Sequence, residues 1–213
     1  MSAPFLDPGL LAYLEQRLPP REAGLLDMEH SAAERGFPII GPACGALCHL
    51  LARLAGARAI FELGSGFGYS TAWFAKALRD NGGGVVHHTV WDEALSREAQ
   101  ERLRQMGLAD LVRFHCAEAI STLEATPGPF DICLLDIDKT DYPQALPVIA
   151  TKLRRGGLLI ADNILWHGRV WKDEEHSAST EAIRRFTAAV MEDATWWPSI
   201  IPLRDGLMLA LRR

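Results

Sequence analysis

The sequence Phe61-Glu62-Leu63-Gly64-Ser65-Gly66-Phe67-Gly68-Tyr69-Ser70 decides the fold of this chain. An apolar run over 57–63 leads into it, and a helix-like run over 71–78 follows it. Strand, glycine-rich turn and helix in this order begin an α/β nucleotide-binding unit. The glycines let the backbone come close to a ligand, and the helix N-terminus offers free N–H groups.

The glycine spacing narrows the choice of ligand. A dinucleotide fingerprint reads GxGxxG, whereas the glycines here fall at positions 64, 66 and 68. Glu62 stands two residues before the first glycine, where it would repel a pyrophosphate but suits a ligand with an amine or a sulfonium. A tight turn that binds nothing is the alternative, because short motifs also match by accident.

The composition is that of an ordinary globular chain. A length of 213 residues suits one domain, and 48% hydrophobic with 23% charged residues is typical. The net charge of −5 does not indicate binding to nucleic acid, which favours basic proteins. No apolar run approaches the ~20 residues that a membrane-spanning helix needs. The first five residues lack the regions of a signal peptide. We therefore expect a cytoplasmic protein without nucleic-acid or membrane partners.

The four cysteines, Cys44, Cys48, Cys116 and Cys133, each sit among apolar residues. They form no CxxC pair and no Cys/His metal spacing. Buried thiols in a reducing cytosol are the expected state.

Strand-like and helix-like segments alternate after residue 58. Strands are predicted at 59–63, 85–90, 111–116, 130–136, 158–162, 196–203 and 206–211. Helices are predicted at 5–18, 21–35, 43–54, 69–79, 92–106, 119–124, 142–153 and 180–192. Alternation implies a parallel sheet with helices on both faces, whereas the Asp205-Gly206 turn leaves no room for a helix and makes the last strand antiparallel. We expect a helical cap over 1–35 and the main domain over 36–213.

Polar residues follow two of these strands, where open α/β sheets bind their ligands. Asp136, Asp162 and Asn163 are oxygen ligands that suit a hard divalent ion such as Mg²⁺. Helix and turn capping is an equally good explanation of all three. Lys139 follows Asp136 by three residues, and beside a metal ion it could accept a proton, although most lysines are simply solvated.

Together these segments resemble the metal-dependent S-adenosylmethionine O-methyltransferases, the group of catechol and caffeoyl-CoA O-methyltransferases and their bacterial relatives. The resemblance covers about 36–212 and rests on motifs in the family's order. They are the glycine loop at 61–71, the Asp-x-Asp-Lys-x-x-Tyr segment at 135–142, the strand and loop at 156–170, the hairpin at 202–207, and the N-terminal segment at 38–42.

The resemblance implies a Rossmann-like methyltransferase sandwich with seven strands, and it implies residue roles. Lys139 would be the general base, and Asp136, Asp162 and Asn163 would hold the metal, Mg²⁺ first, with Mn²⁺ or Ca²⁺ as alternatives. S-adenosylmethionine would contact Ile40, Glu62, Gly64, Ser65, Gly66, Tyr69, Ser70, Trp91, Asp92, Glu118, Ala119 and Asp136. A small catechol-like or phenolic acceptor would receive the methyl group.

The chain departs from this family at the end of the second strand. The family usually places an acid there, on the cofactor ribose, and the position falls on Val90. Asp92 could reach the ribose or could simply cap the next helix, while Trp91 could stack on the adenine. The loop Trp166, His167, Arg169 and Trp171 is typical of an acceptor pocket or of a dimer contact, and we expect a homodimer.

Two other functions stay open at this stage. A nicotinamide-dependent oxidoreductase is disfavoured by the glycine spacing, by Glu62 and by the Asp162-Asn163 pair. A catalytically weak or non-catalytic relative is suggested by Val90 but disfavoured by the intact Asp136 and Lys139.

Overall fold

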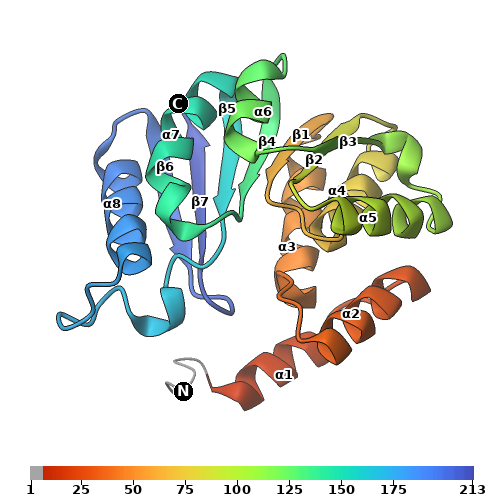
Figure 1. Ribbon diagram of the computed structural model, residues 1–213, viewed down its shortest axis with the longest axis horizontal. Helices are drawn as coiled ribbons and strands as arrows, with labels where there is room; N and C mark the ends of the chain where they lie inside the picture. The colour runs from red at the N-terminus through yellow and green to blue at the C-terminus, as the bar shows by residue number, and fades with distance from the viewer. Residues whose placement is uncertain (1–6) are drawn as a thin grey trace.

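Seven strands form one sheet in the order β3-β2-β1-β4-β5-β7-β6 (Figure 1). The strands of this computed structural model, which describes residues 7–213, are β1 (Ala59–Leu63), β2 (Val85–Val90), β3 (Val112–Cys116), β4 (Phe130–Leu135), β5 (Leu153–Ala161), β6 (Trp196–Ile201) and β7 (Leu207–Arg212). β1 to β5 run parallel, and β7 pairs antiparallel with both β5 and β6. The predicted α/β fold with an antiparallel last strand is confirmed.

Helices cover both faces of this sheet (Figure 1). They are α1 (Pro8–Gln16), α2 (Ala23–Arg35), α3 (Gly41–Leu54), α4 (Tyr69–Asp80), α5 (Glu93–Gln105), α6 (Ala119–Ala125), α7 (Tyr142–Lys152) and α8 (Ala178–Glu192). Short 3-10 turns lie at Ala109–Leu111, Lys139–Asp141 and Trp166–Gly168. α3, α4 and α5 pack on one face, and α6, α7 and α8 pack on the other.

Alternate residues of each strand enter two separate cores. Ile60 and Ile132 belong to the core under α3 and α4, whereas their neighbours Phe61 and Cys133 belong to the core under α6, α7 and α8. Side chains of a strand point to opposite faces in turn, so a strand covered on both sides is apolar throughout. This is why β4 and the second half of β5 are largely hydrophobic at successive positions.

The N-terminal helices differ in how they are held. Leu25, Met28 and Ala32 of α2 are buried in the core under α3 and α4, and Gly36, with φ of 61°, ends that helix in the left-handed conformation. α1 buries none of its residues. The predicted first helix began at residue 5, which lies outside the described residues. The division between residues 35 and 36 stays a prediction.

Three details differ from the sequence expectations. β5 begins at Leu153 rather than 158, because Leu153 pairs with Phe130 before the register of the β4–β5 pair shifts. β4 and β5 end at Leu135 and Ala161, so Asp136 and Asp162 come directly after their strands. Cys116 is exposed, which corrects the expectation of four buried thiols, since it ends the edge strand β3. Along residues 7–213 no helix is long and apolar enough to cross a membrane.

Candidate active site

A cavity of about 700 Å³ opens at the carboxyl ends of the parallel strands. Its lining comes from the ends of β1, β2, β3, β4 and β5, from the segment before α3, and from the turn between β6 and β7. Thirteen of the predicted site residues line it, namely Ile40, Gly64, Ser65, Gly66, Tyr69, Ser70, Trp91, Glu118, Ala119, Asp136, Lys139, Asp162 and Asn163. Glu62 and Asp92 do not.

The glycine loop forms one wall, and its backbone is fixed to the neighbouring strand ends. Ser65 N donates to Thr89 O at the end of β2 (2.9 Å), and Asp136 N donates to Leu63 O of β1 (2.8 Å). Gly64 adopts φ of 85°, and a Cβ there would overlap the carbonyl oxygen of Asp136. Glycine is therefore required where β1 meets β4, because no other residue allows this approach.

Glu62 lies behind the loop, fully buried, in a network that contains Thr71 and His88. Thr71 Oγ1 donates to Glu62 Oε2 (2.5 Å) and lies 3.0 Å from His88 Nδ1. Glu62 Oε1 and His88 Nε2 are buried and have no hydrogen-bond partner among residues 7–213. Burial raises the pKa of Glu62 to about 7, against hydroxyl donors that lower it, and burial lowers the pKa of His88 to about 3.

Replacing Glu62 by glutamine should stabilise the protein more at pH 8 than at pH 5. The unfolded chain ionises Glu62 near 4.5, whereas the folded chain holds the proton up to about pH 7. Stability is therefore lost as the pH rises between these values, and Glu62→Gln removes that loss, worth about 1–3 kcal/mol. Urea unfolding at both pH values measures the change. Glu93→Gln, on an exposed residue of α5, is the control, and a Glu62→Gln effect that is equal at both pH values would contradict the expectation.

The end of β2 carries no acid that faces the cavity. Val90 is buried and apolar, and Trp91 is 83% exposed beside it. Asp92 Oδ1 accepts hydrogen bonds from Ala94 N (2.8 Å) and Leu95 N (2.9 Å), so this carboxylate caps α5. Of the two roles considered for Asp92, the helix cap is the one that the structure shows.

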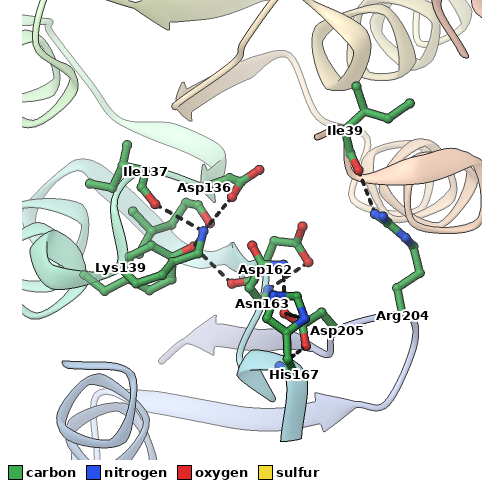
Figure 2. A network of polar contacts seen from close by, with 11 residues as sticks. Ile39, Asp136, Ile137, Lys139, Asp162, Asn163, His167, Arg204 and Asp205 are labelled. Carbon is green, nitrogen blue, oxygen red and sulfur yellow. Dashed lines mark hydrogen bonds and ion pairs between the residues drawn. The ribbon is translucent and has the colours of Figure 1, made fainter. Parts of the chain in front are cut away.

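The adjoining wall, at the ends of β4 and β5, brings together the predicted metal ligands (Figure 2). Asp162 is 3% exposed, and its Oδ1 accepts from Asn163 N (2.8 Å). Asn163 adopts φ of 59°, and its Nδ2 donates to Asp205 Oδ2 (3.1 Å). An amide whose nitrogen is engaged in this way leaves its oxygen available as a ligand.

Lys139 reaches the same wall from the 3-10 turn after β4 (Figure 2). Its Nζ donates to Asp136 Oδ1 (2.8 Å), Ile137 O (3.1 Å) and Tyr142 Oη (3.0 Å). Tyr142 is buried and hydrogen-bonds to the carbonyl oxygens of Leu135 and Asp162. The three acceptors hold the amine beside the carboxylates instead of in solvent.

The ionised form of the buried Asp162 carboxylate is disfavoured in this wall. Burial, and next the neighbouring carboxylate of Asp136, raise the pKa of Asp162 to about 7, against the Asn163 N–H and the charges of Arg204 and Lys139. A bound cation would relieve both effects, so the donor set fits a hard divalent ion. Within residues 7–213 no three His, Cys, Asp or Glu side chains gather around one point, and the candidate set is two carboxylates and an amide.

No site role was predicted from the sequence for Arg204, Asp205 or Tyr142. Arg204 and Asp205, at the turn between β6 and β7, both line the cavity. Tyr142 connects Lys139 to β4 and β5 from below. The Asp205-Gly206 turn signal placed the hairpin but gave no sign of these contacts. In the loop after β5, Trp166 and His167 line the cavity, whereas Arg169 and Trp171 do not.

Known proteins resemble this chain in both sequence and fold. The profile of the O-methyltransferase family matches residues 29–213. A catechol O-methyltransferase of Niastella koreensis is 31% identical over 210 residues, 93% of this chain and 94% of that protein. The crystal structure of the O-methyltransferase TomG from Streptomyces achromogenes, involved in tomaymycin synthesis and solved in complex with SAM, is 28% identical, with a TM-score of 0.86 and 96% of each chain covered. A methyltransferase from Geobacter sulfurreducens is 26% identical, with a TM-score of 0.83, 99% of this chain and 100% of the other.

Proposed function

The chain belongs to the O-methyltransferase family, and we propose that it moves a methyl group from S-adenosylmethionine to a hydroxyl of a small catechol-like or phenolic acceptor, assisted by a divalent metal. One observation carries the proposal. The glycine loop and the oxygen-ligand set Asp136, Asp162 and Asn163 line the same cavity. A methyl donor on the loop and an acceptor chelated by the metal would therefore lie side by side.

The cofactor side of the cavity suits S-adenosylmethionine, which supplies a methyl group on a positively charged sulfur when bound. Gly64 and Gly66 allow the backbone to approach the methionine part, and Ser70 lies in the first turn of α4, where a carboxylate is favoured. Trp91, Glu118 and Ala119 line the end where the adenine would lie. The SAM complex of TomG, an O-methyltransferase of the same fold, supports this assignment.

Asp136, Asp162 and Asn163 would hold the metal, with Mg²⁺ favoured over Mn²⁺ and Ca²⁺. A divalent ion bound there would lower the pKa of an acceptor hydroxyl and fix its oxygen. Asp205 orients the Asn163 amide, and Tyr142 positions Lys139. The metal ligands and Lys139 would together hold the reacting oxygen in place. Such positioning can raise the rate by several orders of magnitude.

Lys139 is the proposed general base, because its Nζ lies 2.8 Å from Asp136 Oδ1, at the wall where the acceptor would lie. The proton of the acceptor hydroxyl would move to Nζ in its amine form. Ile137 O and Tyr142 Oη then accept hydrogen bonds from the resulting ammonium. The buried surroundings (Lys139 is 10% exposed) exclude water from this transfer.

Replacing Lys139 by alanine should lower kcat about 10²- to 10⁴-fold, the usual contribution of a general base, with little change in the affinity for the cofactor. Steady-state kinetics and calorimetry with S-adenosylhomocysteine measure the two quantities. Lys172→Ala, outside the cavity, is the control. A fall in kcat that disappears at higher pH, where hydroxide deprotonates the acceptor, fits the role, and an unchanged kcat at neutral pH contradicts it.

The function itself is tested by calorimetry with S-adenosylmethionine, followed by methyl transfer to a panel of catechols and phenols with Mg²⁺ or with a chelator. We expect binding of the cofactor and turnover that the chelator stops. Turnover that the chelator leaves unchanged would overturn the metal assignment. Stabilisation by NAD(H) but not by S-adenosylmethionine would overturn the whole proposal, although family membership leaves the oxidoreductase alternative without support.

A weakly active or non-catalytic relative is the second candidate, favoured by the end of β2. Val90 offers no hydrogen bond to a ribose, and Asp92 is engaged as a helix cap. A cofactor dissociation constant in the millimolar range, with no turnover of any acceptor, would favour this candidate over an enzyme.

The homodimer and the cytoplasmic location stay proposals. Trp197 lies on the edge strand β6 and is 66% exposed. It pairs with Leu211 of β7, which is also exposed. An exposed aromatic residue on an edge strand suits contact with a second copy of the chain. Light scattering after size exclusion should give twice the mass of 23.5 kDa, and Trp197→Glu should reduce it to the monomer.

A further inference from the structure

Arg204 connects two parts of the chain that lie far apart in sequence. From the turn between β6 and β7 its Nη1 donates to Ile39 O, 165 residues away, over 2.8 Å (Figure 2). Ile39 belongs to the segment 37–40, which precedes α3 and lines the cavity. The contact therefore joins the hairpin to a wall of the candidate site.

The backbone at both ends of this contact is unusual. Arg204 adopts φ of 52°, a conformation that favours glycine. Gly41 adopts φ of 75°, and a Cβ there would lie 3.0 Å from Cζ and Nε of Arg204. The arginine side chain thus crosses the bare face of Gly41. Both residues of this contact therefore have a left-handed backbone conformation. Unusual backbone conformations are commonly found at functional sites.

The segment 37–40 is also held at its other end, on the glycine loop. Phe37 packs edge-on against Phe67, with ring centroids 5.1 Å apart, and a Cβ at Gly66 would contact Phe37. The segment therefore spans the cofactor side of the cavity, with the glycine loop at one end and Arg204 at the other. Only the Arg204 end depends on a single polar side chain.

We propose that Arg204 is a positioning residue that keeps the segment 37–40 closed over the cofactor, so that its loss releases the cofactor faster. The identity of that cofactor rests on the function proposed above. Two other roles predict different results. An arginine that binds the acceptor would affect the KM for the acceptor, and one that serves only stability would leave ligand affinity unchanged.

Arg204→Gly tests the proposal, because it removes the guanidinium and relieves the positive φ, so the fold is retained. We expect faster hydrogen exchange of the amides at 39–41 in the free protein. We also expect the dissociation constant for S-adenosylhomocysteine to rise about tenfold or more, as for the loss of a charged hydrogen bond. The KM for S-adenosylmethionine should rise by a larger factor than kcat falls. Arg204→Lys, which keeps a donor and the charge, should lie between wild type and Arg204→Gly.

Arg58→Ala is the matched control. Arg58 also donates to a backbone carbonyl, that of Asn81, but it lies at the end of β1 away from the cavity. Unchanged exchange at 39–41, or a change confined to the KM for the acceptor, would overturn the proposal. If the wild-type protein does not bind S-adenosylhomocysteine, the proposed function fails instead, while exchange in the free protein still reports on the contact.

Discussion

Asp162→Asn is expected to lose at least about 10³-fold in methyl-transfer rate and yet to unfold at the same temperature as the wild type or higher. In the proposed mechanism an ion held by this carboxylate would contribute several kcal/mol, and each 1.4 kcal/mol is about tenfold in rate. The gain in stability has a separate cause. Burial and Asp136 raise the pKa of Asp162 to about 7, so its ionised form destabilises the fold at neutral pH. The asparagine keeps the oxygen that accepts from Asn163 N and removes the charge.

Thermal unfolding and steady-state kinetics at pH 7.5 measure both halves of this expectation. Asp173→Asn, on an exposed residue outside the cavity, should change neither. A variant with lower stability and lower activity together would mean that Asp162 serves the fold. Retained activity that a chelator does not affect would show that the carboxylate is no metal ligand. Opposite changes in stability and activity are what functional sites usually show.

Gly64→Ala is expected to destabilise the fold by about 2–4 kcal/mol and to abolish cofactor binding. A Cβ at this position overlaps the carbonyl oxygen of Asp136, which is backbone and cannot move aside. β1 and β4 would have to separate where the hydrogen bond from Asp136 N to Leu63 O now joins them. The same movement would displace Asp136 itself, so both walls of the cavity would change.

Gly56→Ala is the control that isolates this clash. Gly56 also has a positive φ, 56°, but nothing lies within 4 Å of its added Cβ. Gly56→Ala should lower the free energy of unfolding only by the strain of a left-handed alanine, about 1–2 kcal/mol, and should leave cofactor binding intact. Urea unfolding and calorimetry with S-adenosylhomocysteine give the comparison. Equal effects of the two substitutions would show that the requirement for glycine at position 64 comes from backbone strain and does not come from the contact with Asp136.

The strand ends could be predicted because their chemistry is local. An apolar run that stops at an acid marks both the end of a buried strand and the group that follows it, as at Asp136 and Asp162. Parallel strands end on one edge of the sheet, so these residues meet without any knowledge of the loops. The glycine loop was predictable for the same reason, since its spacing is contained in ten residues.

The contacts of the hairpin could not be predicted, because they depend on distant parts of the chain. Nothing in the residues around Arg204 indicates that Ile39 will accept its hydrogen bond, or that Asp205 will bind the Asn163 amide. Both require the three-dimensional path of the β6–β7 turn. The exposure of Cys116 has a similar origin, because the sequence does not show that β3 lies at the edge of the sheet.

The order of the strands has a consequence for how such a site diversifies. β1, β4 and β5 are consecutive in the sheet. The glycine loop follows β1, and Asp136 and Asp162 follow β4 and β5. Neighbouring strands lie ~4.8 Å apart, a spacing fixed by backbone hydrogen bonds and independent of side chains. Under the proposed function, this strand spacing would set the distance between the methyl donor and the receiving oxygen. Changes in the loops around the cavity would then alter which molecules enter without altering this strand spacing.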